Sequence, residues 1–173
     1  HQTGTDRIYE ALQIFGNQDI DLVMNLQGDE PLINVEDIKN LNNHMKKNKY
    51  QLGTLASNIL KKDYYKNQNI VKVITKENLN MENFPEALNF KRFVNEQNKN
   101  IYHHLGIYCY QVQALKNFTS LSQTTNELDN KLEQLRALDN NIKINVALAK
   151  SSSIGVDTKE DFLAIKKLME YKT

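Results

Sequence analysis

Hydrophobic residues recur along the chain in alternating helical and extended patterns. Residues 5–15 carry apolar side chains at helical spacing, and Gly16 follows them as a natural C-terminal stop. Residues 20–26 read as a buried strand that ends in a polar turn. Asn34 then stands where it can cap the next helix, because its side-chain oxygen can accept a bond from a free backbone N–H.

The same pattern continues to the end of the chain. Further strands are predicted at residues 52–60, 70–75, 101–111 and 142–148, the last of them with one buried face because its apolar residues alternate. Residues 128–138 are predicted to form one helix with leucines along one side, whereas the Asn-rich residues 79–100 give no clear prediction. Strands that alternate with helices predict an α/β fold: a mixed, mostly parallel sheet with helices on both faces.

Acidic residues follow two of the predicted strands. Ligands of such sheets bind outside the carboxyl ends of the strands, which is where Asp29 and Asp157 stand. Two carboxylates from separate strands make a hard-oxygen site suited to Mg²⁺, which takes one or two carboxylates together with substrate phosphates. Each residue also has a local interpretation, Asp29 as a turn former and Asp157 as a partner of the helix that follows it.

Composition narrows the class of protein. A chain of 173 residues with 40% hydrophobic residues fits a single domain spanning residues 1–173. Its 22 basic and 21 acidic side chains give a formal charge of +1, which argues against a nucleic-acid binder. No signal peptide or membrane-spanning run is present in the sequence, and the single Cys109 excludes an internal disulfide. The predicted location is the cytoplasm.

Six short motifs, taken in their order along the chain, are similar to those of one enzyme family. They are HQTGTDR at residues 1–7, NLQGDEP at 25–31, VKV at 71–73, HLGIY at 104–108, LEQLRAL at 132–138 and GVDT at 155–158. The series resembles the 3-deoxy-manno-octulosonate (Kdo) cytidylyltransferases of lipopolysaccharide biosynthesis, and the resemblance extends from residue 1 to about residue 169. It implies a Rossmann-like nucleotide-diphospho-sugar transferase fold.

The resemblance also implies a reaction and its metal. The expected activity is Mg²⁺-dependent transfer of CMP from CTP to Kdo, with release of pyrophosphate. By resemblance, Asp29 and Asp157 hold the catalytic Mg²⁺, and Thr5 and Arg7 lie on the nucleotide side. Phosphoryl transfer needs little covalent help from the protein, so metal ions and positioning suit it.

The sugar side is expected to be polar. His104 and Tyr108 stand four residues apart on one predicted strand and therefore share a face, whereas the adjacent His103 is expected to lie on the other face as surface. By resemblance, further sugar contacts are Gln27, Glu133 and Gln134. Arg92 is assigned to the Kdo carboxylate, although its surroundings keep only part of the family motif, and Arg136 is expected to brace its helix. Alternatively, His104 is a buried structural imidazole, and Glu133 and Gln134 form a solvated helix face or a dimer contact.

Other features of the family are absent from these residues. The Gly-rich triphosphate loop has no counterpart in the 173 residues, so we expect an N-terminally truncated fold that is poorly active by itself.

The resemblance implies a homodimer with CTP and Kdo as its small-molecule partners. Two other functions remain open: a cytidylyltransferase for another acid sugar, such as a sialic-type acid, and a non-catalytic binding module on the same fold.

Overall fold

A six-stranded mixed sheet forms the centre of the computed structural model, which describes residues 1, 3–16, 19–28, 30–95, 99–150, 155–156 and 158–170. The strands are β1 (Leu22–Asn25), β2 (Leu52–Ser57), β3 (Lys72–Thr75), β4 (Ala87–Lys91), β5 (Ile101–Gln111) and β6 (Ile144–Leu148). The helices are α1 (Gly4–Phe15), α2 (Val35–Asn48), the short 3₁₀ helix η1 (Lys62–Tyr65), α3 (Val112–Thr119), α4 (Thr125–Asn130), α5 (Gln134–Asp139) and α6 (Lys159–Glu170).

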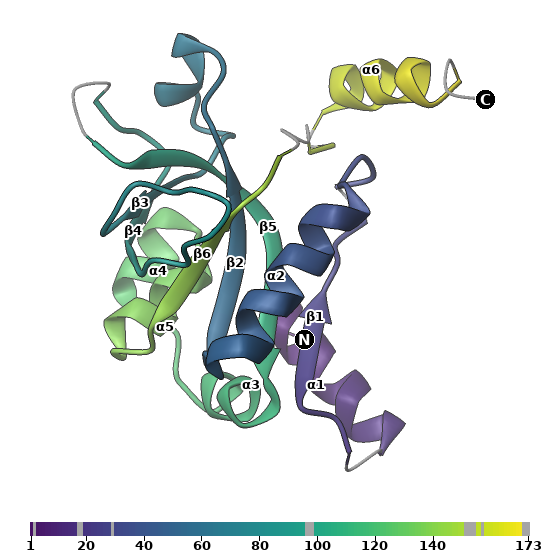
Figure 1. The fold of residues 1–173 in the computed structure, drawn as a ribbon, viewed down its shortest axis with the longest axis vertical. Helices are drawn as coiled ribbons and strands as arrows, with labels where there is room; N and C mark the ends of the chain where they lie inside the picture. The colour runs from purple at the N-terminus through teal and green to yellow at the C-terminus, as the bar shows by residue number, and fades with distance from the viewer. Residues whose placement is uncertain are drawn as a thin grey trace.

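The long strand β5 organises this sheet. The strand order is β4-β3-β5-β2-β6, and β1 pairs with the final part of β5, beyond the residues that pair with β3 (Figure 1). The mixed α/β architecture is confirmed, but the expectation of a mostly parallel sheet is wrong for the described strands. Among neighbouring pairs of the described strands, only β2 and β6 are parallel, because β5 runs opposite to β1, β2 and β3, and β4 runs opposite to β3.

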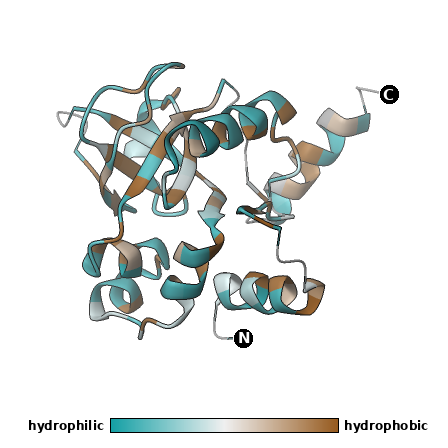
Figure 2. Cartoon of the chain, turned by 60° about the horizontal axis from the view of Figure 1, so that its bottom comes forward, coloured by the Kyte–Doolittle hydropathy of each residue, from teal (hydrophilic) through white to brown (hydrophobic). Residues whose placement is uncertain are grey.

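Helices cover both faces of the sheet, as predicted, and a separate hydrophobic core lies on each face. On one face α2 packs Leu41 and Met45 against residues of β2, β5 and β6, including Leu55. On the other face α1, α3 and α5 cover Tyr108 and Tyr110. In Figure 2 the helices carry hydrophobic and hydrophilic residues together, as expected of helices that cover a core.

Several helix ends form where the sequence predicts them. Gly16 ends α1 in a left-handed conformation (φ 66°), and Asn34 caps α2 by accepting a bond from the backbone N–H of Glu36. The prediction of one helix over residues 128–138 is wrong. The chain forms α4 and α5 instead, separated by Lys131 in a left-handed conformation (φ 53°).

Strand β6 also differs from its prediction. It begins at Ile144 and buries both faces, because it lies parallel to β2 between the two cores: Ile144 and Val146 belong to one core and Ala147 to the other. Within the described residues, no helix is both long and apolar enough to cross a membrane.

Candidate functional site

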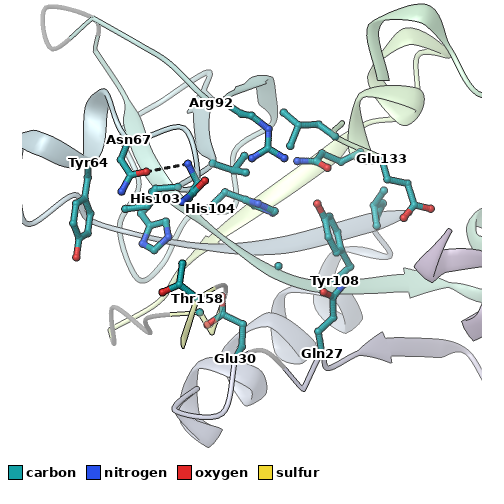
Figure 3. Close-up of a pocket in the computed structure, with 18 of the residues that line it drawn as sticks. Gln27, Glu30, Tyr64, Asn67, Arg92, His103, His104, Tyr108, Glu133 and Thr158 are labelled. Atoms are coloured by element: carbon teal, nitrogen blue, oxygen red, sulfur yellow. Dashed lines mark hydrogen bonds between the residues drawn. The ribbon is translucent and has the colours of Figure 1, made fainter. Parts of the chain in front are cut away.

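A cavity of about 830 Å³ opens beside β5 and contains most of the residues predicted to carry function (Figure 3). Its wall comes from the end of β1, from residues 60–71 around η1, from Arg92 after β4, from β5, and from the approaches to α5 and α6. All six predicted sugar-binding residues line it: Gln27, Arg92, His104, Tyr108, Glu133 and Gln134. The fold thus brings together residues that are up to about a hundred positions apart, while their binding of a sugar stays a prediction.

His104 is a buried, neutral imidazole in this wall. Its Nε2 lies 3.0 Å from the Thr54 hydroxyl, and that hydroxyl donates to the backbone oxygen of Ile107 at 2.7 Å. Because the hydroxyl proton is already engaged there, His104 must donate from Nε2, which leaves Nδ1 as an acceptor. Burial, with a smaller contribution from His103, lowers the pKa of His104 to about 3. His104 therefore makes a structural bond through Nε2 and keeps Nδ1 as an acceptor.

Tyr108 and Tyr110 continue this face of β5. The rings of His104 and Tyr108 lie 5.4 Å apart, which confirms that the two residues share a face. Burial raises the pKa of the Tyr108 phenol, and the nearby Tyr110 and Glu133 add to the effect. The phenol therefore stays protonated and can donate a hydrogen bond. Glu133 brings a buried carboxylate oxygen, Oε1, which has no hydrogen-bond partner among the described residues.

Arg92 reaches the cavity from the segment after β4 and is held firmly. Its Nε donates to the backbone oxygen of Asn130 at 3.0 Å, its Nη1 to that of Gln68 at 2.9 Å, and its Nη2 to that of Lys131 at 3.1 Å. A guanidinium has five N–H groups, so one remains on each terminal nitrogen. Such a pair matches the two oxygens of a carboxylate.

His103 does not lie on a remote surface as expected. It lines the same cavity, with its ring edge-on to Tyr64 of η1 at 6.1 Å between centroids. Burial, with Lys72 as a second cause, lowers the pKa of His103 to about 4, and its buried Nδ1 has no hydrogen-bond partner among the described residues. The alternation of side chains along β5 led us to expect His103 on the face away from the site. Tyr64 of η1 packs against His103 there, and both residues line the cavity.

Lys72 is a second residue that the sequence analysis did not assign. It is fully buried in β3, and burial, together with the charge of Arg92, lowers its pKa to about 8. The available signal was a lysine among the apolar residues of the predicted strand at residues 70–75. Arg136, by contrast, is confirmed as a brace: its guanidinium forms a buried ion pair with Glu127 at 2.5 Å.

The two predicted metal ligands, Asp29 and Asp157, lie outside the described residues. Near neighbours of each line the cavity: Gln27 and Glu30 on either side of the first, Gly155 and Thr158 on either side of the second. The described residues contain no group of three or more His, Cys, Asp or Glu placed to hold a metal ion. The side chains near this end, an amide, a carboxylate and a hydroxyl, offer the oxygen donors that suit Mg²⁺.

The two predicted nucleotide-side residues are placed differently. Thr5 is buried in the first turn of α1, with its hydroxyl 3.5 Å from the hydroxyl of Tyr110, which lines the cavity. Arg7 is exposed on α1 and is not part of the cavity wall. Their nucleotide contacts stay a prediction.

Comparison with known proteins places the chain among nucleotide-transferring enzymes. A family model described as cytidylyltransferase matches residues 1–144. The chain is 42% identical to the 3-deoxy-manno-octulosonate cytidylyltransferase of Thermodesulfovibrio yellowstonii and 38% identical to that of Bartonella bacilliformis, in each case over 98% of this chain and 70% of the relative.

Solved structures give the same result. The structure of CMP:2-keto-3-deoxy-manno-octonic acid synthetase complexed with CTP matches all of this chain and 70% of its own, with a TM-score of 0.85 and 29% identity. An apo UDP-glucose pyrophosphorylase matches 99% of this chain with a TM-score of 0.68 and 12% identity, which is a likeness of fold alone.

Proposed function

This chain belongs to the 3-deoxy-manno-octulosonate cytidylyltransferase family, and on that basis we propose that it couples CTP and Kdo to form CMP-Kdo and pyrophosphate. The observation that carries the proposal is the cavity of about 830 Å³ beside β5. The six predicted sugar-binding residues line it, and so do near neighbours of Asp29 and Asp157 in the sequence.

The reaction is a displacement at phosphorus. The anomeric hydroxyl oxygen of Kdo forms a bond to the α-phosphorus of CTP and loses its proton, while the bond from that phosphorus to the bridging oxygen breaks and pyrophosphate leaves. The protein contributes mainly by holding the two substrates in line, because this chemistry depends on positioning and on stabilising charge.

The sugar end of the cavity suits an acid sugar. The two remaining N–H groups of Arg92 would bind the Kdo carboxylate, and the free Nδ1 of His104 would accept from a sugar hydroxyl. Tyr108 would donate its phenolic proton. Gln27, Glu133 and Gln134 line the same cavity and would complete the hydroxyl contacts. Thr5 and Arg7 would serve the cytidine side.

The metal proposal rests on Asp29 and Asp157. These carboxylates would hold Mg²⁺ at the end of the cavity lined by Gln27, Glu30 and Thr158. When bound, Mg²⁺ would neutralise charge on the phosphates and orient the attacking oxygen.

The test is pyrophosphate release by the full-length protein with CTP and Mg²⁺. Kdo should support turnover, and a sialic-type acid should not. Asp29→Asn and Asp157→Asn should each reduce kcat by at least about a hundredfold with folding retained, because each removes a ligand of the metal that stabilises transferring phosphate. Turnover with the sialic-type acid alone would assign a different acid sugar, and binding of CTP without turnover of either would indicate a binding module.

We also propose the protein's wider setting: a cytoplasmic homodimer that supplies lipopolysaccharide biosynthesis. The 173-residue chain by itself should be poorly active, because it contains no Gly-rich loop that could grip a triphosphate. Light scattering of the full-length protein would report a monomeric mass if the dimer proposal is wrong. Activity of the isolated chain equal to that of the full-length protein would contradict the second expectation.

A further inference from the structure

Lys72 is a buried cation whose contacts are all backbone oxygens. Its side chain has no exposed surface, and its Nζ donates to the carbonyl oxygens of Asn67 at 2.8 Å, Ile70 at 2.7 Å and Arg92. In the described part of the chain, no carboxylate lies within ion-pair distance of this ammonium. The three residues that accept from it all line the cavity.

These contacts join the two segments that hold Arg92 in place. One contact fixes the main chain of Arg92 itself. The other two fix residues 67–70, and the carbonyl of Gln68 within that turn accepts from Nη1 of Arg92. Lys72 therefore holds both the base of the Arg92 side chain and one of the groups that orient its tip.

The residue type supports a specific task. An ammonium is the one side-chain group with three N–H donors on a single atom, which matches three converging carbonyls. Taking a cation out of water costs free energy that an apolar residue in the same strand would not cost. Val73, its neighbour in β3, shows that this strand buries apolar side chains fully.

We infer that Lys72 is a positioning residue for recognition of the sugar acid, acting through Arg92. It holds residues 67–70 and the Arg92 backbone so that the two unused N–H groups of the guanidinium meet the substrate carboxylate. The inference rests on the proposed function of the cavity, because it assigns Arg92 to an acid sugar.

The experiment is steady-state kinetics of the full-length protein with CTP, Mg²⁺ and Kdo. Lys72→Met should raise the KM for Kdo by about tenfold or more and leave the KM for CTP within about twofold, because only the sugar end is misplaced. Lys91→Met is the matched control: Lys91 pairs with Lys72 across β3 and β4, but its side chain is exposed. Both of its KM values should be unchanged.

A double variant separates positioning from general damage. If Lys72 acts through Arg92, Lys72→Met should add less than about twofold to the KM for Kdo in an Arg92→Ala background. The inference would be overturned if the rise in the KM for Kdo in the double variant equalled the product of the rises in the two single variants. It would also be overturned if Lys72→Met raised the KM for Kdo and the KM for CTP equally. Wild-type protein that does not turn over Kdo would instead refute the proposed function.

The inference stays testable if Lys72→Met does not fold. Circular dichroism and the thermal midpoint would reveal that, and Lys72→Gln, which keeps two N–H donors in place of three, would then be measured. Arg92→Ala removes only a partly exposed side chain and must raise the KM for Kdo. An unchanged KM for Kdo in Arg92→Ala overturns the inference whatever the Lys72 variants do.

Discussion

A single neighbour, Thr54, decides which ring nitrogen of His104 donates a hydrogen bond and which accepts one. The Thr54 hydroxyl gives its proton to the backbone oxygen of Ile107, so it can only accept from the imidazole. With its pKa lowered by burial to about 3, the ring stays neutral throughout the physiological range. The sequence predicts that His104 faces the site, but it does not predict this arrangement, because Thr54 lies fifty positions away.

This neutral ring makes stability depend on pH. The pKa of His104 falls from 6.5 in the unfolded chain to about 3 in the folded one, so the unfolded state binds more protons below pH 6.5 and stability falls as the pH drops. Between about pH 7.5 and pH 5, the free energy of unfolding in urea should therefore fall by about 2 kcal/mol more for wild type than for His104→Gln. Lys116→Gln, at an exposed position of α3 that does not titrate in this range, is the control and should lose as much stability as wild type. Equal losses in wild type and His104→Gln would contradict the prediction.

The connections between elements depend on close contacts on both faces of the sheet. On one face, α2 crosses β2 at Gly53, where an added Cβ would lie 2.6 Å from Met45 Sδ and 2.7 Å from Phe84 Cζ. On the other, α4 and α5 are joined by the buried pair of Glu127 and Arg136, and Arg136 also lies over the ring of Phe118. The second contact sets the position of α5, whose Gln134 lines the cavity.

Gly53→Ala should destabilise the protein by about 1–3 kcal/mol, because the methyl group must displace the packed side chains of α2 and of residue 84. The measurement is the free energy of unfolding in urea. Gly28→Ala is the control, since nothing lies within 4 Å of its added Cβ, and its free energy of unfolding should be unchanged. A stable Gly53→Ala protein would show that α2 can move away from the sheet without cost.

Arg136→Met should cost about 3–5 kcal/mol of stability at neutral pH, because it leaves the Glu127 carboxylate buried without its partner. Burial alone would raise the pKa of Glu127, but its bonds with Arg136 and Gln123 outweigh that and lower it. The double variant Glu127→Leu/Arg136→Met should recover part of the loss, which chemical denaturation can measure. Recovery of nothing would mean that the packing of Arg136 on Phe118 matters more than the charges.

Across the whole molecule, the sequence predicted correctly those elements whose formation depends on residues near one another in the chain. Strand β5 has the bounds predicted for residues 101–111, and Gly16 and Asn34 end and begin helices as expected. Each of these depends on residues close in the sequence: the apolar run of the strand, a glycine free to adopt φ 66°, and a capping side chain.

The features that local patterns missed depend on distant contacts. The break between α4 and α5 coincides with Asn130 and Lys131, whose carbonyls accept from the guanidinium of Arg92, almost forty positions earlier. His103 joins the cavity wall because η1 packs Tyr64 against it. No periodicity in the sequence contains these pairings. The motifs identified residues that the fold brings together at the cavity. The role of Lys72 could be seen only in the structure, because it depends on how its ammonium meets two nearby carbonyls and that of Arg92, twenty positions later.

Strand β1 has a practical consequence for anyone who handles this chain. Among the described strands it pairs only with β5, so the backbone groups along its other side offer a template to which a further strand could add. We therefore expect concentrated samples of the 173-residue chain to self-associate, and sedimentation velocity should show species that grow with loading. Asn25→Lys, at the polar end of this strand and outside both cores, should suppress them by electrostatic repulsion, whereas Lys116→Glu, on α3, should not. The lysine variant of β1 would then be the better choice for crystallisation trials.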